Sequence, residues 1–204
     1  MEARSAPQPE IRDVGRIQAF TDGVMAVAIT LLVLNIEVPE LPSGSEAQLD
    51  EQLVDLLPSL VAYAISFALV GRYWVVHHHI FEDLRTFDGA LMGLNLVFLS
   101  LIGLVPFSSD LVDRYGEEPI AAAVFAATLG LAGAVNTLMV RHIRRRGFAP
   151  AADESNRVGG RVSLVIAVVF LLSIPVAFLS VDGARLMWLA VFLVRFPVRR
   201  LSRR

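Results

Sequence analysis

In the stretch RIQAFTDGVMAVAITLLVL, residues 16–34, the part from Phe20 on is apolar enough for lipid, yet it carries a carboxylate and a hydroxyl. Asp22 lies near its start and Thr30 near its middle. An ionisable group inside a membrane helix is costly unless it is paired or hydrated, and such groups mark ion paths and proton relays. Polar side chains can also hydrogen-bond one helix to another. These residues therefore indicate ion coordination, proton transfer or interhelical bonding.

The composition of the chain sets the class of protein. Of 204 residues, 55% are hydrophobic, and the mean hydropathy is +0.60. The apolar residues form long uncharged blocks separated by charged loops, which is typical of a polytopic membrane protein. The absence of cysteine excludes disulfides, thiolate metal sites and cysteine nucleophiles. No nucleophile–base pattern or phosphate-binding loop supports an enzyme.

Six apolar blocks predict an all-α membrane protein with six transmembrane helices. A spanning helix needs about 20 apolar residues, and the first five blocks satisfy this, whereas the sixth is short and contains Arg195. We expect a cytoplasmic segment over 1–18, a transmembrane domain over 19–198 and a cytoplasmic tail over 199–204. The expected spans are 19–36, 58–76, 90–109, 119–140, 162–180 and 184–198.

The distribution of arginine predicts the orientation. Arginines precede the first block, lie between blocks two and three and between four and five, and follow the sixth, while the alternate loops are acidic. The positive-inside rule then puts both termini in the cytoplasm of a multi-pass protein, which we expect in the cell (inner) membrane. Glu37 and Glu40, in the first outer loop, could concentrate cations there.

This topology places several polar residues at one membrane level. Asp22, His77, His78 and Asn95 all lie near the inner ends of the first three spans. We expect Asp22 to accept a hydrogen bond from a histidine or from Asn95, with Arg16 or Arg72 able to add a charge-assisted bond. Taken residue by residue, locking the helices together is the favoured interpretation. A proton relay or ion site is the alternative.

Three consecutive histidines, residues 77–79, also raise the question of a metal. Successive helical side chains project about 100° apart, so these three cannot converge on one ion. Histidines at i, i+4 spacing are absent. We therefore expect no tightly bound structural metal and no cofactor.

Four residues of the first span form one stripe: Val27, Thr30, Leu31 and Leu34 follow the i, i+3, i+4, i+7 rule. Periodicity alone favours helix packing or contact with lipid. The alternative is a pore wall, in which aliphatic side chains form a hydrophobic constriction and a hydroxyl replaces part of an ion's hydration shell. Such a wall needs several copies related by symmetry.

Two segments carry a resemblance to a known family. The first span resembles the signature of the transmembrane protein 175 family, whose bacterial members are potassium-permeable channels. Its matching positions are Arg16, Phe20, Asp22, Gly23, Thr30, Leu31 and Leu32, with Thr21 where serine is usual. Residues 72–112 resemble a second part of that family at Trp74, His77, His78, Phe81, Asp88, Asn95, Leu99, Pro106 and Phe107. The resemblance covers roughly the first 115 residues.

The resemblance implies a homotetramer in the lipid bilayer with the first helix lining a central pore. It implies a constriction at Val27, with Leu31 and Leu34 further out, and a hydroxyl layer at Thr30 near which K⁺ passes. It also implies a structural hydrogen-bond network among Arg16, Phe20, Thr21, Asp22, His77, His78 and Asn95. The family has no Thr-Val-Gly-Tyr-Gly filter, and none occurs here.

The sequence thus predicts a channel for passive K⁺ flux, with potassium ions as its partners and no nucleic acid. The chief alternative is a proton-coupled secondary transporter that uses Asp22 with His77 or His78. Such carriers commonly have inverted repeats and interrupted helices. Pro175 could interrupt the fifth span, but we expect no internal break in the first and third spans beyond glycine residues. A purely structural membrane scaffold is a third possibility.

Overall fold

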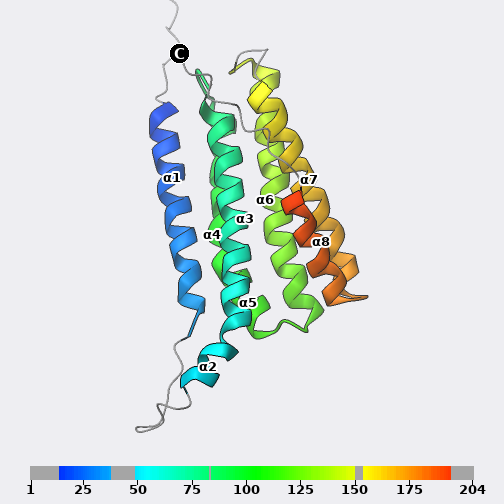
Figure 1. Ribbon diagram of the computed structural model, residues 1–204. Helices are drawn as coiled ribbons and strands as arrows, with labels where there is room; N and C mark the ends of the chain where they lie inside the picture. The colour runs from blue at the N-terminus through cyan, green and yellow to red at the C-terminus, as the bar shows by residue number, and fades with distance from the viewer. Residues whose placement is uncertain (1–13, 38–48, 83, 150–153, 194–204) are drawn as a thin grey trace, which may run out of the picture.

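The computed structural model describes residues 14–37, 49–82, 84–149 and 154–193. Four parts of the predictions lie outside these ranges: residues 1–13 of the expected cytoplasmic segment 1–18, the expected tail 199–204, Glu40 and Arg195. The described chain folds into one 3-10 helix and a set of α-helices (Figure 1). These are α1 Val14–Leu31, η1 Leu32–Asn35, α2 Leu49–Asp55, α3 Leu57–Glu82, α4 Gly89–Gly103, α5 Val105–Arg114, α6 Pro119–Arg146, α7 Glu154–Ala177 and α8 Val181–Leu193.

Five helical segments of the described chain are long and apolar enough to cross a membrane. They are Val14–Asn35, Leu53–Glu82, Gly89–Arg114, Pro119–Arg146 and Arg157–Ala177, and they correspond to the first five expected spans. The all-helical membrane class is therefore confirmed. The α8 helix has 13 described residues, and the expected span 184–198 continues beyond them. A sixth crossing stays a prediction.

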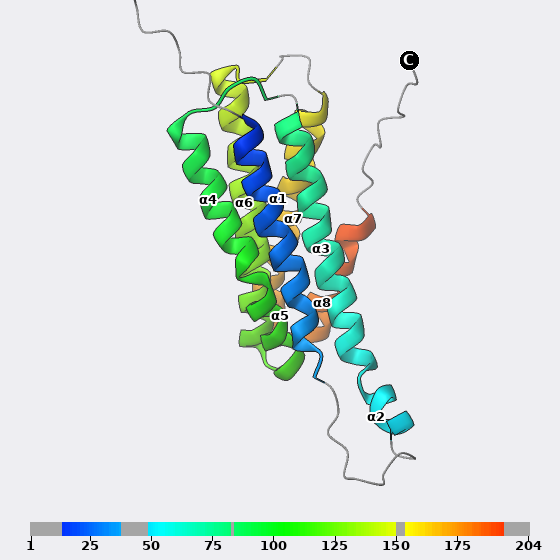
Figure 2. The ribbon, with the colours of Figure 1, turned by 90° about the vertical axis from the view of Figure 1, so that its left-hand side faces the viewer.

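The α1 helix lies at one edge of the bundle, beside α3 and α4 (Figure 1). Figure 2 views this edge and shows α1 in front of the other helices. Its buried residues recur at helical spacing, at Ile17, Thr21, Met25 and Ala28, so one stripe faces the bundle. No described residue covers the opposite side.

The expected span 90–109 is two helices in the structure. The α4 helix ends at Gly103 and α5 begins at Val105. Pro106 lies in the first turn of α5, where its missing N–H removes the bond that would continue α4. The start of α5 is also bonded to the first span, because Pro106 O accepts a hydrogen bond from Asn35 Nδ2 at 3.0 Å.

The α6 and α7 helices lie side by side and pack closely (Figure 1). At Gly133 an added Cβ would lie 2.9 Å from the Ser163 carbonyl oxygen, and at Gly160 it would lie 2.9 Å from Val140 Cγ1. Glycine at these positions lets the two backbones approach, as small residues do between membrane helices. This closely packed pair lies on the side of the bundle away from α1 (Figure 1).

Candidate functional site

A buried hydrogen-bonded chain joins α1, α4 and α3. Asn95 Nδ2 donates to Thr21 Oγ1 at 3.0 Å, and Asn95 Oδ1 accepts from His77 Nε2 at 2.8 Å. All three side chains are at most 2% exposed. Since Oδ1 can only accept, His77 carries a proton on Nε2. One asparagine therefore joins α4 both to α1 and to α3.

The His77 ring is also held by aromatic packing. Its centroid lies 4.1 Å from that of Phe81 and 5.4 Å from that of Phe98, with both pairs stacked. The ring is therefore in an apolar enclosure, with Asn95 as the hydrogen-bond partner of its Nε2. This environment suits a structural role better than proton exchange with water.

The Asp22 carboxylate has a different partner from those expected. Trp74 Nε1 donates to Asp22 Oδ1 at 2.8 Å, whereas the sequence led us to expect a histidine or Asn95. The Trp74 ring is 39% exposed and stacks on His78, with centroids 5.4 Å apart. Asp22 is thus tied to α3 at the edge of the buried chain. The sequence signal for this bond is Trp74 itself, which lies in the second family segment near the depth of Asp22 and carries an indole N–H that can only donate.

The remaining predicted network residues lie outside this buried chain. Arg16 and His78 are exposed, and Phe20 is 54% exposed. Within the described part of the chain, Arg16 forms no ion pair with Asp22. The three consecutive histidines occupy three environments, because His79 lies 3.5 Å from Glu82 instead. No cluster of three or more metal-ligating side chains occurs among the described residues.

The C-terminal end of the first span is anchored separately. Asn35 donates to the Pro106 carbonyl, as described above, and Glu37 Oε1 lies 2.6 Å from Arg114 Nη2. Arg114 also bonds Asp110 at 2.9 Å. Glu37, expected to attract cations, is paired with an arginine here. The first span is therefore bonded to the bundle near both of its ends.

Between these anchors, the predicted stripe faces outward. Val27 is 57% exposed, Leu31 41% and Leu34 70%, and Thr30 is also exposed. Thr30 Oγ1 donates to the Val27 carbonyl of its own helix at 2.9 Å. Its proton is thereby directed at the backbone, and its lone pairs remain available to a cation or water. Gly23 continues this surface toward the N-terminus of α1, with open space where a Cβ would be.

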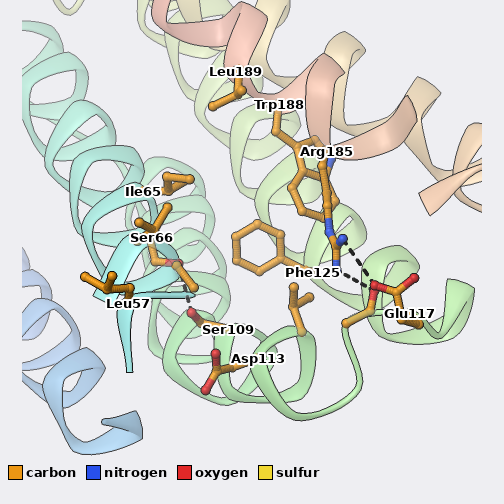
Figure 3. A pocket seen from close by; sticks show the side chains of 14 residues that line it. Leu57, Ile65, Ser66, Ser109, Asp113, Glu117, Phe125, Arg185, Trp188 and Leu189 are labelled. Atoms are coloured by element: carbon orange, nitrogen blue, oxygen red, sulfur yellow. Dashed lines mark hydrogen bonds and ion pairs between the residues drawn. The ribbon is translucent and has the colours of Figure 1, made fainter. Parts of the chain in front are cut away.

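A cavity of about 730 Å³ lies elsewhere, between α3, α5, α6 and α8. Figure 3 shows its mostly apolar lining, with Phe125 and Trp188 on one side and Ser66 hydrogen-bonded to Ser109 at 2.8 Å. Arg185 lies at its edge and bonds the Gly116 carbonyl at 2.7 Å. No α1 residue lines this cavity, so it is separate from the exposed stripe.

Comparisons with known proteins agree with this arrangement. The family model described as endosomal/lysosomal potassium channel TMEM175 matches residues 16–106. A Streptomyces collinus protein named as a potassium channel is 35% identical over 179 residues, covering 83% of this chain and 85% of that protein. The human protein named endosomal/lysosomal proton channel TMEM175 is 34% identical over 111 residues, covering 51% of this chain and 22% of that protein.

A solved structure is also similar. The crystal structure of a lysosomal potassium-selective channel TMEM175 homologue from Chamaesiphon minutus has a TM-score of 0.72 and 31% identity. The match covers 88% of this chain and 95% of that one. The segment that holds the exposed stripe and the buried hydrogen-bonded chain is also the one that the family model matches. On these grounds the chain belongs to the TMEM175 family.

Proposed function

We propose that this protein is a potassium-permeable channel through which K⁺ flows passively down its electrochemical gradient. The family, the bacterial relative named as a potassium channel and the similar potassium-selective structure support this function. The proposal includes a homotetramer of six-span subunits in the cell (inner) membrane, with both termini in the cytoplasm. The arginine distribution supports that orientation.

The observation that carries the proposal is the outward stripe of α1. A helix bonded to the bundle near both ends presents Val27, Thr30 and Leu34 to the outside, and nothing else in the described chain covers them. One copy leaves this surface against lipid. Four copies around an axis turn the same surface into a continuous wall.

Within that wall the side chains have separate tasks. Val27, Leu31 and Leu34 form the hydrophobic constriction, whose width controls wetting and hence conduction. Thr30 supplies a ring of four hydroxyl oxygens that replaces part of the K⁺ hydration shell. The ion is then held by oxygen dipoles without any fixed charge, which favours weak binding and fast release.

The polar groups at the inner end support the wall and do not meet the ion. Thr21, Asn95 and His77 are buried, and Asp22 is bonded to the Trp74 indole. The proton-coupled carrier is less well supported, because it needs Asp22 and a histidine on one wet path. His77 is enclosed by two phenylalanine rings instead.

Flux through liposomes containing the purified protein tests the proposal. We expect K⁺ flux without an imposed pH gradient, and we expect Val27→Trp to block it. Val168→Trp on α7 is a matched control, because Val168 is also an exposed valine, 46% exposed, on a helix away from α1. Unimpaired flux through Val27→Trp would contradict a constriction at Val27. Crosslinking should give four subunits, and a stable monomer would contradict the shared wall.

Proton flux needs its own measurement, since the human relative is named as a proton channel. The same liposomes with a pH-sensitive dye report it. Flux of K⁺ that strictly requires a pH gradient would favour the carrier. Proton flux with little K⁺ flux would move the proposal from a potassium to a proton channel.

A further inference from the structure

A pocket of about 410 Å³ lies between α6 and α7, away from α1. Four arginines line it: Arg141 and Arg144 from α6, and Arg157 and Arg161 from α7. No carboxylate is among its lining residues. The end of α6 and the beginning of α7 lie side by side at one end of the bundle (Figure 1), so these charges gather at one membrane level.

The spacing of the arginines places them on facing surfaces. Arg141 and Arg144 are three residues apart, and Arg157 and Arg161 are four apart, so each pair shares one helical face. Close packing at Gly160, next to Val140, brings the two faces together. The four arginines therefore line one volume.

Three of these arginines are free to bind a ligand. Arg141, Arg144 and Arg161 are exposed, and within the described ranges none has an ion pair or a hydrogen bond from its guanidinium. Arg146, on the same last turn of α6, differs because it lies 3.6 Å from Asp88. Neighbouring positive charges repel, so the pocket is stabilised by any anion that enters it.

The pocket also has an apolar part, formed by side chains of α6 and α7. Val140 and Leu164 line it, and Leu164 is 43% exposed. Arginine forks match phosphate oxygens in paired hydrogen bonds. Basic pockets between transmembrane helices bind anionic lipid headgroups. A ligand that has a phosphate group for the arginines and an acyl chain for the apolar residues would fit both parts of the pocket.

We propose that this four-arginine pocket binds the headgroup of one anionic phospholipid per subunit. The phosphate lies among the guanidinium groups, and the first part of an acyl chain lies against Val140 and Leu164. The proposal requires α6 and α7 to span the membrane. It does not depend on K⁺ conduction, so lipid binding and ion flux can fail separately.

Native mass spectrometry of the full-length protein in detergent tests the proposal, with phosphatidylglycerol and phosphatidylcholine as probes. We expect one phosphatidylglycerol per subunit to bind in preference to phosphatidylcholine. The double variant Arg141→Gln/Arg161→Gln should weaken that binding about 30-fold, since each arginine near an anionic surface contributes about fivefold. A matched control is Arg85→Gln/Arg145→Gln, which removes the same charge from exposed arginines near that end of the bundle but outside the pocket.

The outcomes separate the possibilities. Loss in the pocket variant with retention in the control supports the site. Equal loss in both variants would show a general surface charge effect and would overturn it. Equal binding of both lipids would also overturn it, and so would full competition by soluble glycerol phosphate, because the ligand would then be a free phosphate. Size-exclusion chromatography checks that each variant remains folded.

Discussion

Replacing Asn95 with leucine should loosen α1 from the bundle. The change keeps the side chain close in size and removes two interhelical hydrogen bonds, at 2.8 Å to His77 and 3.0 Å to Thr21. Both partners are buried and lose this bond. Interhelical bonds in membranes average about 0.6 kcal/mol and reach about 1.7 kcal/mol. Two such bonds predict a loss of about 1–3 kcal/mol in the free energy of unfolding.

Unfolding in mixed micelles, followed by circular dichroism as the denaturing detergent increases, measures this loss. Thr128→Val is the matched control, because the Thr128 hydroxyl donates to the Val124 carbonyl of its own helix and joins no second helix. We expect the control to change stability by less than about 0.5 kcal/mol. If Asn95→Leu is no more destabilising than the control, the buried chain does not fix α1 and the reasoning is refuted.

Three further changes probe other parts of the account. Thr30→Ala should alter the K⁺/Na⁺ permeability ratio, measured under bi-ionic conditions, with the oligomer intact; an unchanged ratio removes Thr30 from selectivity. Trp74→Phe removes the donor to Asp22 and should cost about 0.5–1.5 kcal/mol in thermal unfolding while flux per assembled channel persists; lost flux in an assembled variant would place Asp22 in permeation. Burial acts to raise the pKa of Asp88, but hydrogen bonds from a backbone N–H and from His142 outweigh it and hold the pKa below its usual 3.8. The ionised Asp88 therefore stabilises the folded state above pH 3.8, and this stability is lost as the pH falls through the lowered pKa. Asp88→Asn should lower the melting temperature at pH 7, and its difference from the native protein should shrink as the pH falls below 3.8; a pH-independent difference counts against this.

The predicted depth of each polar residue in the membrane was the sequence feature that best predicted the buried hydrogen-bonded chain. Asp22, His77 and Asn95 are far apart in the chain, and only the topology put them at one level. The structure brings Asn95 and His77 into contact, and it adds Thr21. Depth in the membrane does not determine how each helix is rotated about its axis. It therefore could not predict which side chains would contact each other. For this reason the partner predicted for Asp22 was wrong: its carboxylate accepts a hydrogen bond from Trp74, not from a histidine or Asn95.

The stripe on α1 shows a second limit of prediction from the sequence. Helical spacing predicted that Val27, Thr30 and Leu34 share a face, but spacing is equally compatible with a buried or an exposed stripe. Their exposure follows from the bonds of Thr21 and Asn35, which turn the opposite face toward the bundle. Hydropathy also could not predict the break between α4 and α5 at Leu104, because the apolar run continues across it.

Potassium flux measured against sodium flux in the same liposomes tests the central claim most directly. The account predicts that the native protein passes K⁺ faster than Na⁺ with no pH gradient, and that Val27→Trp abolishes this flux while Val168→Trp preserves it. Absence of K⁺ flux from correctly assembled protein, or flux that is indifferent to Val27→Trp, would contradict a pore lined by the exposed face of α1.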